Sequence, residues 1–199
     1  MQQALHHLKQ LPHLQPLVES ISLAEPNTSG DLYYDLLDSI VSQQLSVKVA
    51  TVIFNRFLTL FDGGYPHPKQ LIRMDIETMR GVGLSYQKAN YLKNVATFFE
   101  EHQLDGNNWH TTLTDEEIVK YLSQIKGVGK WTVEMILMFT LQRPDVFPVD
   151  DLGIQQGMMR LYGLPNDKTL KKRMGEIADE WRPYRTTACR LIWRWKDQK

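Results

Sequence analysis

The stretch from Gly127 to Thr132 reads Gly-Val-Gly-Lys-Trp-Thr, and its two glycines flank a single apolar residue. Glycine adopts backbone angles that other residues avoid, so this spacing predicts a tight turn that reverses the chain between two helices. A helix that begins near Lys130 presents its unpaired amides and the positive end of its dipole beside that turn. Such a seat binds phosphate without reading bases, and a simple helix corner is the alternative interpretation.

Two adjacent acidic residues, Asp150 and Asp151, follow this turn along the chain, with Pro148 shortly before them. Neighbouring residues on a helix point about 100° apart, so the two carboxylates cannot perform one task together. One of them is expected to cap the helix that begins here, and the other to face a cleft. Without further information, both residues are explained as caps.

The glycine turn and the acidic pair together resemble the helix-hairpin-helix (HhH-GPD) DNA glycosylase superfamily, and most closely its 3-methyladenine DNA glycosylase II (AlkA-like) branch. The resemblance covers roughly residues 30 to 197. It implies that the hairpin grips DNA phosphates through Gly127, Gly129, Lys130 and Thr132. It also implies that Asp151 faces the active-site cleft and serves cleavage of the base–sugar bond, which leaves the capping role to Asp150.

The implied reaction requires the base to leave the stack and enter a pocket while positive charge builds on the sugar. A carboxylate beside the sugar stabilises that charge. A base methylated at N3 or N7 is cationic, so an aromatic face attracts it by ~0.5–2 kcal/mol beyond area burial. The resemblance makes Trp131 and Trp193 pocket candidates, with core packing as the alternative for each. Leu152 stands where the family has a pocket tyrosine, and it joins these candidates.

Superfamily members that also cut the DNA strand carry a lysine at the position of Trp131, and Lys130 lies one residue too early. We therefore expect a monofunctional glycosylase for alkylated purines of the 3-methyladenine and 7-methylguanine type, which acts in base excision repair and leaves an abasic site. No metal or redox cofactor is expected, although the resemblance allows a monovalent cation at the carbonyls of residues 125 to 130. The alternatives are a non-catalytic helix-hairpin-helix DNA-binding protein and a glycosylase of the same fold for uracil or mismatched bases.

Two amides, Gln43 and Gln44, interrupt an apolar pattern that ends at Val41 and resumes at Val49. Amide side chains are out of place in a core, so they either cap the helix junction or face a ligand. By the resemblance, Gln44 fills the gap that a flipped base leaves in the duplex.

A second glycine turn, Gly81-Val82-Gly83, precedes Ser85 and a helix with a clear apolar stripe. The stripe consists of Ala89, Leu92, Val95, Ala96 and Phe99. The repeated turn fits a helix corner, and it also fits a second phosphate contact.

Helical periodicity and capping signals extend over the whole chain, and no strand-period alternation stands out. Thr114 and Glu117 have the form of a capping box, and residues 25–30 and 109–112 are expected loops. The expected helices are one or two short ones broken at Pro12 and Pro16, then 31–41, 49–62, 75–80, 85–99, 114 to the hairpin, 130–142, 150–162, 168–179 and 186–195. We predict an all-α protein, a single HhH-GPD unit over 1–199 with the active-site cleft between two lobes. Lobe one covers 31–145 with the hairpin at 125–130, and lobe two covers 1–30 plus 150–199.

The chain has 23 Lys+Arg and 23 Asp+Glu, so attraction to DNA must come from a local patch rather than from net charge. The basic tail from Lys168 to Lys199 is a candidate, with a solvated helix face as the alternative. A single cysteine, Cys189, excludes an intrachain disulfide and a four-cysteine iron–sulfur cluster. No continuous apolar stretch forms a signal peptide near Met1 or reaches the ~20 residues of a membrane span. We expect a soluble monomer without membrane partners, which acts on double-stranded DNA with damaged bases in the cytoplasm, at the bacterial nucleoid, or in a eukaryotic nucleus.

Overall fold

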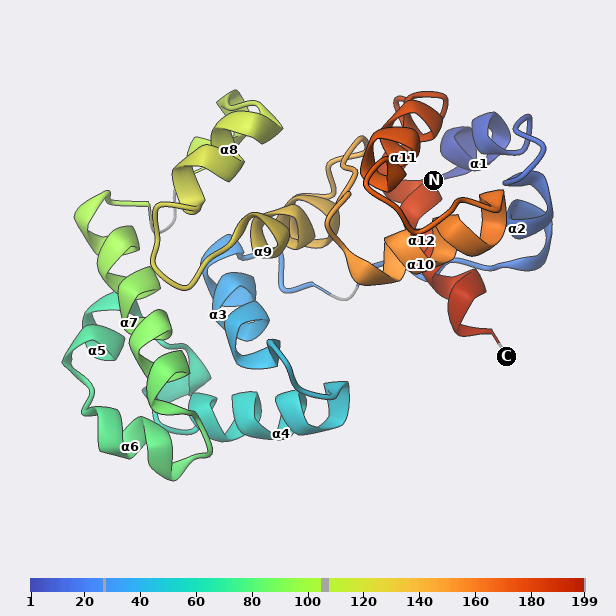
Figure 1. Cartoon of the computed structure of the whole chain (residues 1–199). Coiled ribbons are helices and arrows are strands. Elements are labelled where there is room, and N and C mark those ends of the chain that lie inside the picture. The colour runs from blue at the N-terminus through green and yellow to red at the C-terminus, as the bar shows by residue number, and fades with distance from the viewer. Residues whose placement is uncertain (27, 105–107, 199) are drawn as a thin grey trace. The chain divides into compact units, whose positions relative to one another are not determined.

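The computed structural model describes residues 1–26, 28–104 and 108–198. Asn27 of the predicted loop and Lys199 of the predicted basic tail lie outside the described residues. Within these ranges the chain is helical and contains no strand (Figure 1). The predicted all-α class is confirmed. None of the described helices is long and apolar enough to cross a membrane.

The chain divides into two compact units. Unit 1 joins Met1–Asn27 to Leu137–Lys199, and unit 2 is Thr28–Ile136. The boundary lies inside one helical stretch, because helix α9 (Lys130–Met135) continues directly into the π-helical turn η3 (Ile136–Thr140). The predicted lobe boundary lay later, at residues 145–150. The residues of η3 from Leu137 onward belong to unit 1, where Phe139 packs with Trp193 at 6.0 Å between ring centroids.

Unit 2 is arranged around the long helix α7 (Tyr86–Glu101), which packs against α3, α5 and α6 (Figure 1). The predicted stripe of α7 is buried along its whole length, as the spacing requires. Residues 109–112, expected as a loop, form a short 3-10 turn. The other elements of unit 2 are α3 (Leu32–Ser42), α4 (Val47–Leu58), η1 (Asp62–Gly64), α5 (Pro68–Arg73), α6 (Ile76–Gly81), η2 (Trp109–Thr112) and α8 (Asp115–Leu122).

Side-chain caps begin four helices of unit 2. Asp31, Asp75 and Ser85 each accept a hydrogen bond from the amide three residues ahead. Thr114 and Glu117 form both bonds of the predicted capping box. Each cap satisfies an amide that has no partner inside its helix and typically contributes about 1 kcal/mol. These starts are therefore determined locally.

Helix α4 (Val47–Leu58) differs from the prediction in its length and in which of its residues are buried. It ends at Leu58, before the predicted end at residue 62. Val49, where the predicted apolar pattern resumes, is 46% exposed, and Val52 one turn further on is 43% exposed. The buried stripe is instead Ala50, Phe54 and Phe57, whose i, i+4, i+7 spacing places them on one side of the helix.

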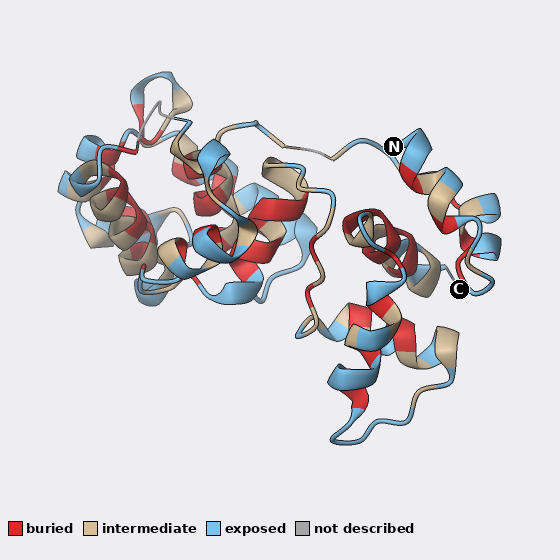
Figure 2. Ribbon diagram, turned by 90° about the horizontal axis from the view of Figure 1, so that it is seen from above, coloured by how far each residue is buried: buried red, intermediate tan, exposed pale blue. Residues whose placement is uncertain are grey.

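Unit 1 is arranged around its last helix, α12 (Arg185–Asp197), which contacts α1, α2 and α10. Figure 2 shows buried and exposed residues sharing the same helices, as expected of amphipathic helices around a core. Pro16, predicted as a break, lies in the first turn of α2, where its missing N–H costs nothing. Gly163 ends α10 in the left-handed conformation, next to the predicted end at residue 162. The remaining elements are α1 (Gln2–Leu8), α2 (Gln15–Ser20), α10 (Leu152–Tyr162) and α11 (Leu170–Asp179).

Asp38 on α3 should make folding stability depend on pH. Burial raises the pKa of Asp38, the Asp35 charge raises it further, and a hydrogen bond from Ser42 opposes both. The folded protein therefore holds this proton more tightly than the unfolded chain, whose aspartates titrate near about 3.9. Stability is lost as the pH rises from that value through the raised folded value. Asp38→Asn should melt at a higher temperature than the unmodified protein near pH 7, and the gain should shrink toward pH 4. An exposed control, Glu77→Gln, should show no such trend, and a gain independent of pH would contradict the assignment.

Candidate active site

Asp151 is the N-cap of helix α10. Its Oδ1 accepts a hydrogen bond from the Ile154 amide at 2.7 Å, and its backbone is extended. Asp150 is exposed, and its Oδ1 lies 2.6 Å from Lys171 Nζ. The expectation that Asp150 caps the helix is therefore wrong. The residue directly before the first helical residue can fold its side chain back onto the third amide, and a residue one position earlier is too far away.

The Asp151 carboxylate has a second hydrogen-bond donor. The indole Nε1 of Trp193 donates to the same oxygen, Oδ1, at 2.9 Å. Hydrogen bonds to an ionised carboxylate are shorter and stronger than bonds between neutral groups. Two donors from different helices therefore hold the Asp151 side chain in one orientation.

The segment that leads to the aspartate pair is anchored to the start of α12. Arg185 Nε donates to Asp145 Oδ1 at 2.7 Å. The Thr186 hydroxyl donates to the Arg143 carbonyl at 2.6 Å and accepts from the Val146 amide at 3.0 Å. Because Trp193 lies on this same helix, α12 positions both the approach to Asp151 and the side chain that binds it.

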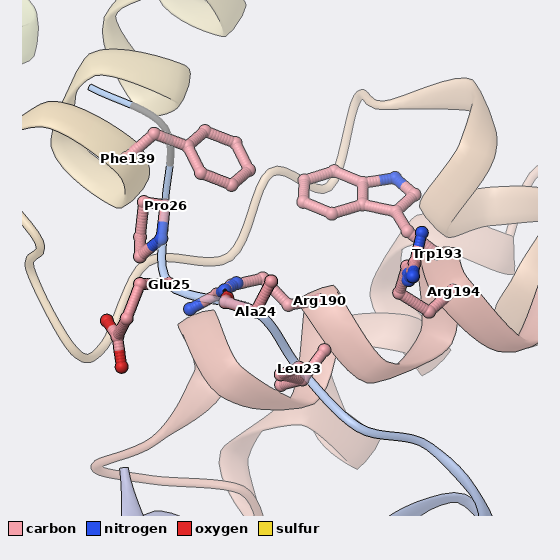
Figure 3. Close-up of a pocket in the computed structure, with 8 residues that line it drawn as sticks. All are labelled: Leu23, Ala24, Glu25, Pro26, Phe139, Arg190, Trp193 and Arg194. Atoms are coloured by element: carbon pink, nitrogen blue, oxygen red, sulfur yellow. Dashed lines mark hydrogen bonds between the residues drawn. The ribbon is translucent and has the colours of Figure 1, made fainter.

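A cavity of about 310 Å³ lies beside Trp193 (Figure 3). Its volume is within the roughly 300–1,000 Å³ usual for ligand pockets. Phe139 and Trp193 both line the cavity, and their ring planes are inclined by 26°. In Figure 3 the six-membered ring of Trp193 is directed toward Phe139, and the indole nitrogen points away from it. The lining residues are Leu23, Ala24, Glu25, Pro26, Phe139, Arg190, Trp193 and Arg194.

Arg190 forms part of the cavity wall and is held in place. Its Nη2 donates a hydrogen bond to the Ala24 carbonyl. Burial lowers the pKa of the Arg190 guanidinium, and the nearby Glu25 carboxylate opposes that shift. Because arginine starts from a pKa above about 12, Arg190 stays charged at neutral pH. The cavity therefore combines aromatic walls with a fixed cation and a carboxylate.

Gly127 is the residue that makes the predicted hairpin turn in unit 2. Its φ is 108°, in the left-handed region, and a Cβ built on it would lie 2.2 Å from the Tyr91 ring. Both the backbone angle and the packing therefore require glycine here. Gly129 is different, because its φ is −91° and no atom lies within 4 Å of an added Cβ. The expectation that both glycines need unusual backbone angles is correct only for Gly127.

The predicted site residues after the turn differ in how far their side chains are buried. Lys130 is exposed and pairs with Glu134 at 3.4 Å, and Trp131 is 41% exposed. Thr132 is only 3% exposed, and its hydroxyl accepts a 3.4 Å hydrogen bond from Gln43 Nε2. The prediction that Thr132 contacts DNA is therefore wrong for its side chain, which is buried. The reason is helical geometry, since a residue near the start of α9 that points inward must join the core of unit 2.

The two glutamines at the α3–α4 junction have different roles. Gln43 ties the junction to the hairpin, because its Nε2 also donates to the Gly127 carbonyl at 3.4 Å. Lys88 Nζ donates to the Val41 and Gln43 carbonyls, each at 2.7 Å, and burial lowers the pKa of Lys88. Gln44 is exposed, and its φ of 58° is uncommon for any residue other than glycine. Such strain is retained where the surrounding structure imposes it, often at ligand-binding positions.

The second glycine turn, Gly81-Val82-Gly83, leads into a helix that has its own side-chain cap. Gly83 has a φ of 107°, almost the value at Gly127. Ser85 then caps α7 with its own side chain, which accepts from the Lys88 amide at 3.1 Å. This cap satisfies an amide that a bound phosphate would otherwise use, so the structure favours the corner among the two alternatives.

Comparison with protein families identifies the fold. The family described as the HhH-GPD superfamily of base excision DNA repair proteins matches residues 37–183 of this chain. The chain belongs to the HhH-GPD superfamily. The match includes the hairpin, the junction glutamines and the Asp150–Asp151 pair.

Individual HhH-GPD relatives are similar over most of the chain. DNA-3-methyladenine glycosylase 1 of Schizosaccharomyces pombe is 37% identical over 182 residues, which is 89% of this chain and 79% of the relative. A putative DNA-3-methyladenine glycosylase of Bacillus subtilis is 34% identical over 82% of this chain and 58% of its own length. The solved structure of the Schizosaccharomyces pombe 3-methyladenine DNA glycosylase Mag1 in complex with abasic DNA has a TM-score of 0.85 and 36% identity. That likeness covers 96% of this chain and 95% of the Mag1 chain.

The structure of this HhH-GPD protein brings some of the predicted site residues together. Asp151 and Trp193 are hydrogen-bonded within unit 1. Leu152 is 70% exposed and is absent from the cavity lining, whereas Trp131 belongs to unit 2. Sequence reasoning missed Phe139 as a cavity wall, because it stands in an apolar helical run where core packing is the ordinary explanation.

Proposed function

We propose that this chain is a DNA glycosylase that excises alkylated purines of the 3-methyladenine and 7-methylguanine type during base excision repair. The observation that carries the proposal is the Asp151 carboxylate, which is held by two donors, one of which, Trp193, also lines an aromatic cavity. Membership of the HhH-GPD superfamily and the activities named for the relatives support it. The substrate is double-stranded DNA that contains a damaged base.

In the proposed mechanism, the hairpin at Gly127 holds backbone phosphates and the damaged base leaves the helical stack. The cationic base lies against the aromatic face of Trp193, and cation–π attraction contributes ~0.5–2 kcal/mol. Trp131 is a further candidate for this contact. As the bond between sugar and base breaks, the base leaves with the bonding electrons, and Asp151 stabilises the positive charge on the sugar. Water then bonds to the sugar carbon and loses a proton to solvent, which leaves an abasic site.

We propose that the enzyme does not cut the strand. The position of Trp131 carries no amine, and the neighbouring Lys130 is paired with Glu134 at 3.4 Å. A Schiff base requires a neutral amine aligned with the sugar. Incubation with methylated duplex DNA should therefore release free 3-methyladenine or 7-methylguanine, and the strand should break only after alkaline treatment. Trapping of a covalent protein–DNA adduct by borohydride would overturn the monofunctional assignment. Binding without base release would instead indicate a non-catalytic DNA-binding protein, and release of uracil alone a different lesion class.

We propose that the reaction needs no metal or redox cofactor, and that the hairpin can hold a monovalent cation. No group of three His, Cys, Asp or Glu side chains that suits a metal ion occurs among residues 1–26, 28–104 and 108–198. The Lys126 and Gly127 carbonyls accept hydrogen bonds from Asn94 and Gln43, at 3.0 and 3.4 Å. Each carbonyl oxygen has two lone pairs and therefore keeps acceptor capacity, and we propose that a monovalent cation binds at the hairpin carbonyls of residues 125 to 130. Such a cation would add positive charge beside a bound phosphate, and the chemistry at Asp151 does not depend on it.

The proposed location follows from the proposed substrate. A protein that acts on genomic DNA works in the cytoplasm at a bacterial nucleoid, or in the nucleus of a eukaryotic cell. We propose that it acts there as a monomer.

Gln44 is the proposed plug for the gap that the flipped base leaves. It is exposed and stands at a junction fixed by Lys88 and Gln43. Gln44→Ala should weaken binding to duplex DNA with an abasic site more than binding to undamaged duplex, because only the former offers the gap. Fluorescence anisotropy with both duplexes measures this, with Gln124→Ala as an exposed amide control. Equal loss on both duplexes would remove the plug role.

A further inference from the structure

The indole of Trp193 presents two different surfaces to its surroundings. Its six-membered ring is directed toward Phe139 (Figure 3), with ring centroids 6.0 Å apart, and both rings line the cavity. Its N–H points the other way and donates to Asp151 Oδ1 at 2.9 Å. One side chain therefore contacts both the cavity and the carboxylate.

Gly153 leaves the space in which this hydrogen bond forms. A Cβ on Gly153 would lie 2.9 Å from Trp193 Nε1 and 3.0 Å from Asp151 Oδ1. Carbon atoms do not approach polar atoms this closely without displacing them, so a larger residue would push the indole and the carboxylate apart. The φ of Gly153 lies outside the left-handed region. The requirement for glycine here is therefore one of space and not of backbone angle.

A second glycine on the same side of α10 brings α12 close. Gly157 follows Gly153 by four positions, so the two lie one above the other on the helix. A Cβ on Gly157 would lie 2.3 Å from Ile192 Cγ2. Ile192 directly precedes Trp193, so this close approach determines how far the indole N–H reaches toward Asp151.

We infer that Trp193 is a positioning residue for Asp151, and that Gly153 and Gly157 set the distance at which it acts. This inference rests on the function proposed above, because it concerns the same carboxylate. A group that stabilises charge in the transition state is effective only when it is oriented before the reaction. The indole N–H is a donor only and cannot take up a proton. Trp193 thus orients the carboxylate without exchanging protons with it.

An isosteric replacement separates this role from that of a cavity wall. Trp193→benzothienylalanine, introduced at a reassigned codon, keeps the bicyclic aromatic shape and replaces the N–H with sulfur. Single-turnover release of 7-methylguanine should fall by about 10- to 100-fold, as expected for loss of a hydrogen bond to a charged group. Affinity for abasic duplex should change by less than about twofold, because the aromatic surface is retained. The control is the same replacement at Trp195, two positions along α12, whose ring stacks with Arg160 at 4.5 Å.

Gly153→Ala tests the same bond from the opposite side, because it keeps the indole N–H and removes the space. It should slow base release in the same way, whereas Gly175→Ala on α11, where no atom lies within 4 Å of an added Cβ, should not. If Gly153→Ala does not fold, the Trp193 replacement decides alone. Full release rates in the Trp193 replacement would overturn the inference and leave Trp193 as a wall.

A measurement without DNA keeps this inference distinct from the proposed function. The ¹⁵N–¹H resonance of the Trp193 indole should shift strongly in Asp151→Ala and remain in place in Asp150→Ala. If the unmodified protein releases no methylated base, the proposed function is wrong. If the Trp193 indole resonance does not shift in Asp151→Ala, the positioning role is wrong.

Discussion

Asp151→Asn should slow single-turnover release of methylated purine by about 10²–10³-fold, the usual cost of removing one preorganised electrostatic group. Asparagine keeps an oxygen that can accept from the Ile154 amide and from Trp193 Nε1, so the helix start and the fold should survive. Only the negative charge is lost. Melting temperature and affinity for abasic duplex should therefore stay close to those of the unmodified protein.

Asp150→Asn is the matched control for this experiment. Asp150 is exposed, and its carboxylate pairs with Lys171 at 2.6 Å. Exposed ion pairs contribute about 0–1 kcal/mol, so this variant should lose little stability and no activity. Loss of base release in a well-folded Asp150→Asn, with full activity in Asp151→Asn, would show that the neighbouring aspartate is the catalytic one. Full activity in both variants would defeat the mechanism.

Gly127→Ala should weaken binding to all duplexes alike, damaged or undamaged, by roughly 10-fold or more, because phosphate contacts do not depend on sequence. The added methyl would lie 2.2 Å from the Tyr91 ring, and alanine disfavours a φ of 108°. Forcing a residue into such a backbone region costs about 1–3 kcal/mol, so the hairpin should deform. The slope of affinity against salt concentration should also flatten, since fewer counterions are released on binding.

Gly129→Ala is the control for the hairpin variant. Its φ of −91° suits any residue, and an added Cβ meets no atom within 4 Å. Anisotropy titrations over a range of salt concentrations, together with melting curves, compare the two variants. If both bind DNA like the unmodified protein, the turn is a corner and not a phosphate seat. If both lose binding equally, the loss does not come from the backbone angle of Gly127, because Gly129 has no such angle.

The sequence by itself determined the features that depend on neighbours within one helical turn. Asp31, Ser85 and Thr114 begin helices because their side chains reach amides three residues ahead. Gly163 ends a helix because it adopts the left-handed conformation without strain. The motif from Gly127 to Thr132 likewise predicted the turn and, through its resemblance, the family.

Only the tertiary structure decided which side chains meet. The stack of Phe139 on Trp193, and the bond from Trp193 to Asp151, join residues that lie far apart in the chain. Helical periodicity shows that a helix has a buried side, but it does not show which neighbour covers that side or how closely. The short distance between α10 and α12 is possible because Gly153 and Gly157 have no side chains. In the sequence, these two glycines indicate only residues with low helix propensity. The orientation of the proposed catalytic carboxylate therefore depends on how closely α10 and α12 pack. Gly153 and Gly157, which have no functional side chain, allow that close packing.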